Sequence, residues 1–295
     1  MNKFLFILSF LSFNVLSTNL DTKNSLIEFY GKSNTKINIV IKDNIDIKGK
    51  VTSAGSLALE KNIASKNAFI IQKLIDADFQ IAGKANLSEW ANFRSEDSAS
   101  GWSSYGGQTK HFLNNEYNPC GSSSGSAVAV AAGIVEIAIG TETNGSISCP
   151  SSVNGIVGFK PTVGLVSRSG IVPISSTQDT AGPMGKSVAL VAKTLEVIAG
   201  YDPLDPSTKD IPDDLDLNFS RDLEHSSISG KRFAILQSDS SNVLMKPKLD
   251  EIKKILLENG AILIEIDDTR EYPGDDEYFL LKYEFKHGLE KYLHL

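Results

Sequence analysis

The chain has 295 residues, 41% of them hydrophobic, with a formal net charge of −7 and a sequence pI of about 5.2. These values are ordinary for a folded domain with a hydrophobic core, and they provide no basic surface for a nucleic acid. Beyond the N-terminus, no apolar run reaches the roughly 18 residues that a membrane-spanning helix needs. The four histidines are scattered and no Cys-x-x-Cys pair is present, so we expect neither a metal nor a cofactor.

The first residues have the pattern of a secretory signal peptide. Lys3 is followed by an apolar run over residues 4–13 and then by a polar stretch that begins near Ser17. We therefore predict a signal peptide at residues 1–17, a mature domain at residues 18–295, and a secreted or periplasmic protein without stable membrane insertion. A buried N-terminal helix or an uncleaved anchor is the alternative interpretation.

Predicted strands and helices alternate along the mature chain, which favours an α/β layered fold. Short apolar, β-branched runs predict strands at residues 37–41, 79–83, 134–139, 233–236 and 261–266. Helical spacing predicts helices at residues 68–77, 87–93 (capped by Asn86), 127–132, 188–199 and 249–257. The Gly-, Ser- and Asn-rich residues 95–126 predict a long loop that is either functional or disordered. Residues 202–216, rich in Asp and Pro, are a candidate subdomain boundary.

One short motif points to a different enzyme class. Gly121-Ser-Ser-Ser-Gly125 matches G-x-S-x-G, the nucleophile elbow of α/β-hydrolases, with Ser123 as the nucleophile. That elbow requires a strand directly before it, whereas residues 114–120 have the composition of a loop. We therefore disfavour Ser123 as a nucleophile.

The two cysteines, Cys120 and Cys149, could form a disulfide in an exported protein. Both lie in Gly- and Ser-rich segments, where we expect small buried residues. We therefore interpret them as reduced packing residues.

Three polar segments, each next to a predicted buried element, stand out together. A predicted strand ends at Lys42, the tract Pro119-Cys-Gly-Ser-Ser-Ser-Gly-Ser126 follows, and the turn Gly140-Thr-Glu-Thr-Asn-Gly-Ser146 leaves the next buried strand. In this order the segments resemble the amidase signature family, and the resemblance extends from about residue 35 to residue 202. Further stretches resemble bacterial peptide amidases: Ser88-Glu-Trp-Ala-Asn-Phe93, Ser100-Gly-Trp-Ser103, Gly106-Gly-Gln-Thr109 and Gln178-Asp-Thr180.

The resemblance implies a role for each residue of the site. Ser146 becomes the nucleophile, Ser122 the bridging serine, preceded by a cis peptide bond from Gly121, and Lys42 the base. A lysine accepts a proton only as a neutral amine, so burial must lower its pKa well below the ordinary value of about 10.4. The resemblance also implies an oxyanion hole at the backbone N–H groups of residues 143–145, which would stabilise the developing negative charge.

The predicted oxyanion hole consists of Thr143, Asn144 and Gly145. Asn144 stands where many family members have Gly or Asp, and asparagine tolerates unusual backbone angles well. Gln178 and Asp179 are left with two interpretations, as members of the site or as caps of a loop.

The resemblance implies a central mixed β-sheet covered by helices on both faces. Family members are considerably longer, so we expect the amidase domain to be incomplete at its C-terminus. The predicted function is hydrolysis of a carboxamide, favouring a peptide C-terminal amide, to an acid and ammonia through an acyl-enzyme. The alternatives are the glutamine-hydrolysing subunit of a tRNA-dependent amidotransferase and a non-catalytic truncated remnant.

Overall fold

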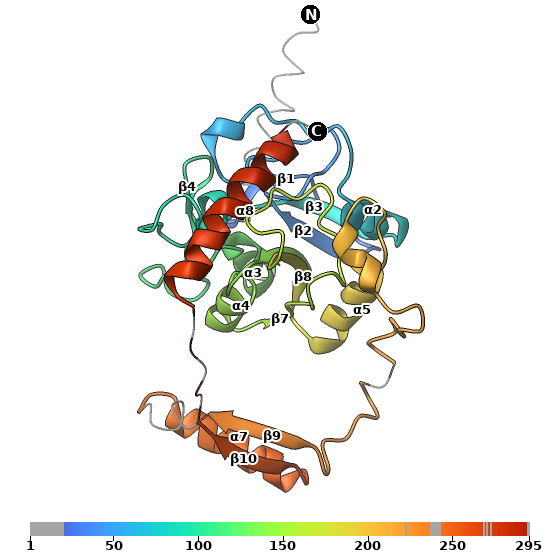
Figure 1. Cartoon of the computed structure of the whole chain (residues 1–295), viewed down its shortest axis with the longest axis vertical. Helices are drawn as coiled ribbons and strands as arrows, with labels where there is room; N and C mark the ends of the chain where they lie inside the picture. Colours follow the sequence, from blue (N-terminus) through green and yellow to red (C-terminus); the bar gives the residue numbers. More distant parts are fainter. Residues whose placement is uncertain are drawn as a thin grey trace, which may run out of the picture. The chain divides into compact units, whose positions relative to one another are not determined.

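The computed structural model describes residues 21–221, 223–236, 243–267, 269, 271 and 273–293 (Figure 1). The predicted signal peptide at residues 1–17 lies outside the described residues and stays a prediction. The chain divides into two compact units, one running to Ser220 and resuming at Leu280, the other formed by residues 221–279. The division falls just after the predicted boundary at residues 202–216. Among the described helices, none has the length and apolar character that crossing a membrane requires.

The larger unit is built on a six-stranded mixed sheet with the strand order β1-β3-β2-β6-β8-β7. Strands β3, β2 and β6 run parallel, whereas β1, β8 and β7 are antiparallel to their neighbours. The strands are β1 (Leu26–Phe29), β2 (Asn38–Lys42), β3 (Gln80–Ala85), β6 (Ile137–Glu142), β7 (Val157–Gly158) and β8 (Thr180–Gly185). The predicted mixed sheet is confirmed.

Both faces of this sheet are covered, because alternate residues of each central strand enter different cores. Ile39 and Ile41 of β2 join one core with α2 (Phe69–Asp76) and α5 (Val188–Ile198). Val40 joins the other core with α3 (Ser124–Ala131). Strands buried on both faces are continuous apolar runs, which is why β2 and β6 are easily recognised in the sequence.

The parallel strands bring two polar segments to the same edge of the sheet. Lys42 is the last residue of β2, and Glu142 is the last residue of the neighbouring parallel strand β6. In sheets of this kind, ligands bind beyond the carboxyl ends of the parallel strands. The turn that follows β6 and the residues that follow β2 are therefore placed together.

The predicted helix over residues 87–93 is wrong. Only a 3-10 turn, η2 (Glu89–Asn92), forms there, and Trp90, Ala91 and Asn92 have φ values of 52°, 54° and 72°. This left-handed backbone is held by tertiary contacts, because the Trp90 N–H donates to the Ala54 carbonyl at 2.8 Å. The predicted cap is also wrong: Ser88 occupies the N-cap position.

Strand β8 and the helix α4 (Ser148–Asn154) escaped prediction. Strand β8 has the sequence Thr-Ala-Gly-Pro-Met-Gly, and glycine and proline are poor strand formers. It forms because β6 and β7 pair with it on either side. The remaining short elements of this unit are η1 (Leu57–Leu59), β4 (Trp102–Ser103), β5 (Gly107–Gln108) and η3 (Pro206–Asp210).

The smaller unit contains a parallel pair of strands, β9 (Arg232–Leu236) and β10 (Ile262–Ile266), and the helix α7 (Lys246–Glu258). The helix α8 (Asp275–Leu293) begins here, and from Leu280 onward it belongs to the larger unit. Apolar side chains of this unit are exposed, among them Ile255, Ile262 and Ile264 at 51%, 50% and 43%.

Amide hydrogen exchange is expected to be faster in the smaller unit than in the larger one. Every residue of β2 and β6 is buried, whereas β10 contains no buried residue, so opening β10 exposes little additional apolar surface. We expect the amides of β9 and β10 to exchange at least about 100-fold faster than those of β2 and β6. Exchange measured by mass spectrometry on the whole chain tests this, and equal protection of the two sheets would contradict it.

Candidate active site

Lys42 is a fully buried lysine with three polar contacts around its amine. Its Nζ lies 2.7 Å from Ser122 Oγ, 2.8 Å from Thr141 Oγ1 and 3.1 Å from the Thr141 carbonyl oxygen. Both Lys42 and Ser122 have an exposed fraction of 0%. The structure thus brings the predicted base and the predicted bridging serine into direct hydrogen-bond contact.

Burial lowers the pKa of Lys42 from its ordinary value to about 7, because a charged amine is poorly solvated in the interior. The carboxylates of Asp179 and Glu142 act in the opposite direction and favour the charged form. A substantial fraction of Lys42 is therefore neutral near pH 7. This is the protonation state that a general base needs.

The turn that holds Ser122 is packed tightly against its surroundings. The peptide bond between Gly121 and Ser122 is cis, as expected, and the Ser122 carbonyl accepts the Ser88 N–H at 3.1 Å. A Cβ atom on Gly121 would clash with Ser88 Oγ, so any larger residue there would force Ser88 to move. Ser123, the disfavoured nucleophile, is fully buried and donates its hydroxyl to the Thr141 carbonyl at 3.1 Å.

A second turn follows β6 and holds Ser146, whose exposed fraction is 7%. The Ser123 N–H donates to the Ser146 carbonyl at 3.1 Å, which ties this turn to the one that holds Ser122. No hydrogen bond between the two hydroxyl groups of Ser122 and Ser146 is present among the described residues. The structure therefore places the predicted nucleophile beside the lysine–serine pair without a direct bond to it.

The predicted oxyanion hole lies in the same turn. Gly145 has a φ of +83°, a backbone conformation that favours glycine. Within the part of the chain that the structure describes, the backbone N–H groups of Asn144 and Gly145 have no acceptor. The oxyanion hole at residues 143–145 stays a prediction.

Two carboxylates, those of Glu142 and Asp179, accept hydrogen bonds from this turn and from the residues that follow it. Glu142 accepts the N–H groups of Ile147 and Ser148, at 2.6 and 2.8 Å, at the start of α4. Asp179 accepts the Thr143 hydroxyl at 2.5 Å and, through its other oxygen, the backbone N–H groups at residues 174 and 175. Asp179 thus caps a loop and also fixes a residue of the predicted oxyanion hole, so both interpretations of this residue apply. Burial raises the pKa of Asp179.

The prediction that the cysteines are reduced is wrong. Cys120 and Cys149 form a disulfide with a Cα–Cα distance of 6.0 Å. Cys120 stands two residues before Ser122, and Cys149 stands three residues after Ser146. The bridge therefore joins the two serine turns covalently.

Sequence reasoning missed two polar residues around Lys42. Thr141 binds the lysine amine through both its hydroxyl and its carbonyl, and Asn44 Nδ2 lies 3.0 Å from the Thr141 hydroxyl. The sequence could have indicated Asn44, because Asp43 and Asn44 directly follow the buried strand that ends at Lys42. Asp43, between them, forms a buried ion pair with Lys84 at 3.0 Å.

The chain matches the Amidase family over residues 35–287. A probable amidase of Arabidopsis thaliana is 41% identical over 263 residues, which cover 86% of this chain and 50% of that protein. The structure of native peptide amidase from Stenotrophomonas maltophilia is 41% identical with a TM-score of 0.85, over 95% of this chain and 63% of that one. A glutamyl-tRNA(Gln) amidotransferase subunit of Methanosarcina acetivorans is 43% identical over 172 residues, covering 58% of this chain and 35% of that subunit.

The chain belongs to the amidase family. It spans about half the length of the curated relatives that it matches over most of its own length.

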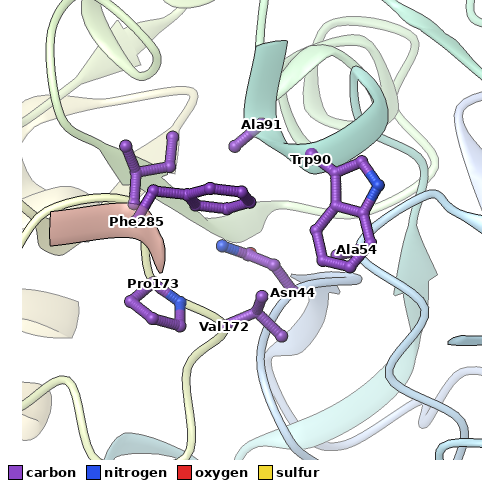
Figure 2. Close-up of a pocket in the computed structure, with 8 residues that line it drawn as sticks. Asn44, Ala54, Trp90, Ala91, Val172, Pro173 and Phe285 are labelled. Carbon is purple, nitrogen blue, oxygen red and sulfur yellow. The ribbon is translucent and has the colours of Figure 1, made fainter. Parts of the chain in front are cut away.

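A mostly apolar pocket adjoins the lysine network, which consists of the hydrogen-bonded side chains of Lys42, Ser122, Thr141 and Asn44 (Figure 2). Asn44 lies in its wall, and the ring of Phe285, from α8, faces the indole of Trp90 across it with a centroid distance of 6.0 Å. The lining residues are Asn44, Ala54, Trp90, Ala91, Val172, Pro173, Ile174 and Phe285. These side chains leave about 0 Å³ open to a water molecule, so Trp90 and Phe285 close the space by packing edge to face.

Glu142→Ala is expected to weaken both the fold and any activity of Ser146. The substitution leaves the backbone N–H groups of Ile147 and Ser148 without their acceptor, at a cost of about 1–3 kcal/mol in the free energy of unfolding. We expect kcat to fall about 10- to 100-fold, because the backbone directly after Ser146 loses the hydrogen bonds that hold it in place. Thermal denaturation and amide hydrolysis measure the two effects. Glu136→Ala, at an exposed glutamate just before β6, is the matched control and should change neither.

Proposed function

We propose that this chain is a serine amidohydrolase that cleaves a carboxamide to an acid and ammonia through an acyl-enzyme. The observation that supports it most is the 2.7 Å contact between the buried amine of Lys42 and Ser122 Oγ. A serine hydroxyl needs an adjacent base to become a nucleophile. A lysine whose pKa is lowered to about 7 meets that need.

The proposed proton path runs from Ser146 through Ser122 to Lys42. Ser146 Oγ attacks the carbonyl carbon, gives its proton to Ser122, and Ser122 gives its own proton to the neutral amine of Lys42. The backbone N–H groups of Thr143, Asn144 and Gly145 stabilise the negative charge on the carbonyl oxygen. Lys42 then returns a proton through Ser122 to the leaving nitrogen, and water cleaves the acyl-enzyme by the same path.

The proposed substrate is a peptide with a C-terminal amide. The 41% identity to the Stenotrophomonas peptide amidase supports this class, as does a second structure of that enzyme bound to the competitive inhibitor chymostatin.

We also propose that the protein is exported. The predicted signal peptide at residues 1–17 supports this localisation. The disulfide between Cys120 and Cys149 supports it too, because disulfides persist in oxidising compartments.

The test is ammonia release from a C-terminally amidated peptide by the purified chain from Thr18 onward, compared with its Ser146→Ala variant. We expect release by the unsubstituted chain, and a loss of at least about 10³-fold in the variant. Circular dichroism and thermal melting of both proteins show whether each is folded.

Each other result identifies an alternative. Equal release by the Ser146→Ala variant would mean that Ser146 is not the nucleophile. Ammonia from free glutamine but not from the peptide would favour an activity like that of the amidotransferase subunits, to which the chain is 42–43% identical over 172 to 174 residues. No release from a cooperatively folding chain would favour the non-catalytic remnant.

A further inference from the structure

Asn44 is a buried amide with only one of its ends hydrogen-bonded. Its exposed fraction is 3%, and its Nδ2 lies 3.0 Å from Thr141 Oγ1. Among the described residues, its Oδ1 has no hydrogen-bond partner. A buried amide oxygen without a donor is costly, by about 1–3 kcal/mol, so its presence beside the lysine network needs an explanation.

The contacts of Lys42 restrict where its hydrogens can be. A neutral amine has two hydrogens and one lone pair, and the Thr141 carbonyl can only accept. If the lone pair is to take the proton of Ser122, both amine hydrogens must go to Thr141, one to its carbonyl and one to its hydroxyl. The observed distances of 3.1 and 2.8 Å fit this arrangement.

The hydroxyl of Thr141 then needs an acceptor for its own hydrogen. Its side-chain neighbours are the amine of Lys42 and the amide of Asn44. The amine hydrogen already points at Thr141, so Asn44 is the acceptor that remains within the described part of the chain. The two ends of an amide have the same shape, and the hydrogen-bond network decides which of them faces a partner.

We propose that Asn44 is a positioning residue for Lys42. By presenting Oδ1 to the Thr141 hydroxyl, its amide turns the lone pair of the neutral lysine toward Ser122. The proposal rests on the proposed function, in which Lys42 is the base. All hydrogen bonds then run in one direction, from Ser122 to Lys42, from Lys42 to Thr141, and from Thr141 to Asn44.

The opposite orientation of the amide leaves the hydroxyl hydrogen of Thr141 without an acceptor. When Nδ2 faces Thr141, the threonine hydroxyl accepts from Asn44, and its own hydrogen can turn only toward the lone pair of Lys42. The lone pair is then no longer open to the proton of Ser122. The orientation of one amide therefore decides whether the neutral lysine faces Ser122 as a base.

The kinetic test uses two substitutions of nearly the same size. Asn44→Leu removes the acceptor, so the Thr141 hydroxyl turns to the lone pair of Lys42, and we expect kcat to fall about 10- to 100-fold with little change in KM. Asn44→Asp keeps an acceptor but adds a charge to those of Glu142 and Asp179, which already favour the protonated lysine. We expect it to retain most of the kcat at high pH, with the acid limb of the kcat profile displaced upward by about one pH unit.

A purely structural role gives a different pattern. Asn44→Leu and Asn44→Asp would then lose kcat together, with lowered melting temperatures and no displacement of the acid limb, and this result would overturn the proposal. A rise in KM without loss of kcat would also overturn it, since Asn44 would then act as a wall of the pocket. Asn218→Leu, at an exposed asparagine, is the matched control and should leave kcat, KM and the pH profile unchanged.

Neutron diffraction from the whole chain tests the proposal without any enzymatic assay. At pH 9, where Lys42 is neutral, the Thr141 deuterium should point at Asn44 Oδ1. Nδ2 facing Thr141 at that pH would overturn the proposal even in an active enzyme. The expected orientation in a chain that releases no ammonia would leave the hydrogen-bond argument standing and refute only the proposed function.

Discussion

Replacing Lys42 with methionine is expected to lower kcat/KM for an amidated peptide by about 10³- to 10⁴-fold. Methionine fills a similar volume but cannot accept the proton of Ser122, whose Oγ lies 2.7 Å from the lysine amine. Steady-state ammonia release measures the change. Lys61→Met, at an exposed lysine, is the control and should leave the rate unchanged. A Lys42→Met enzyme with more than a tenth of the wild-type rate would refute the role of Lys42 as base.

The same residue predicts the pH dependence of the reaction. Only the neutral amine accepts a proton, and burial lowers the pKa of Lys42 to about 7. The rate should therefore rise as the pH rises through about 7 and level off above it. A profile of kcat/KM between pH 5 and 9 tests this, and a rate that falls across that range would contradict it.

The lowered pKa also makes the stability of the fold depend on pH. Between about pH 7 and pH 10.5, the lysine is protonated in the unfolded chain and neutral in the folded one. The unfolded chain then binds one more proton, so this group makes the free energy of unfolding increase with pH, by up to about 1.4 kcal/mol per unit. Urea denaturation at pH 7 and pH 9 should show this increase in the wild type and a smaller one in Lys42→Met.

Removing the disulfide is expected to lower the free energy of unfolding by about 3–4 kcal/mol, because the bridge closes a loop between residues 29 positions apart. For a chain of this size, that loss corresponds to a melting temperature lower by about 10 °C. The variant Cys120→Ala/Cys149→Ala and differential scanning calorimetry provide the measurement. Activity should fall as well, since the bridge joins the turns that hold Ser122 and Ser146.

A reducing agent provides the matched comparison for this prediction. Dithiothreitol should lower the melting temperature of the wild type toward that of the double variant, and should leave the double variant unchanged. Equal melting temperatures for the oxidised wild type and the double variant would show that the bridge does not stabilise the fold.

Sequence alone determined the central elements of the fold. The buried strands that became β2 and β6 are continuous apolar runs, and such runs are recognisable because both faces of the strand must avoid water. The polar segments that end them, at Lys42 and in the turn to Ser146, stood out for the same reason. The order of these segments also identified the family, which the match over residues 35–287 confirms.

Tertiary structure decided the features that depend on contacts between distant segments. The left-handed backbone of Trp90 to Asn92 replaced a predicted helix because the carbonyl of Ala54 and neighbouring loops hold it. Strand β8 forms from glycine and proline because its neighbours pair with it.

The lysine network shows the same division. That Lys42 is a candidate base follows from its position at the end of an apolar strand. That its amine meets Thr141, 99 residues away in the chain, follows from the parallel pairing of β2 with β6. Its contact with Ser122, 80 residues away, depends on the turn before α3, which Ser123 ties to Thr141. The disulfide was mispredicted for a related reason: whether two cysteines 29 residues apart come within 6.0 Å depends on how the chain folds between them. Local sequence determines burial and strand ends, because these reflect the preference of each residue for water. The distances between side chains that are far apart in the sequence depend on how the whole sheet packs.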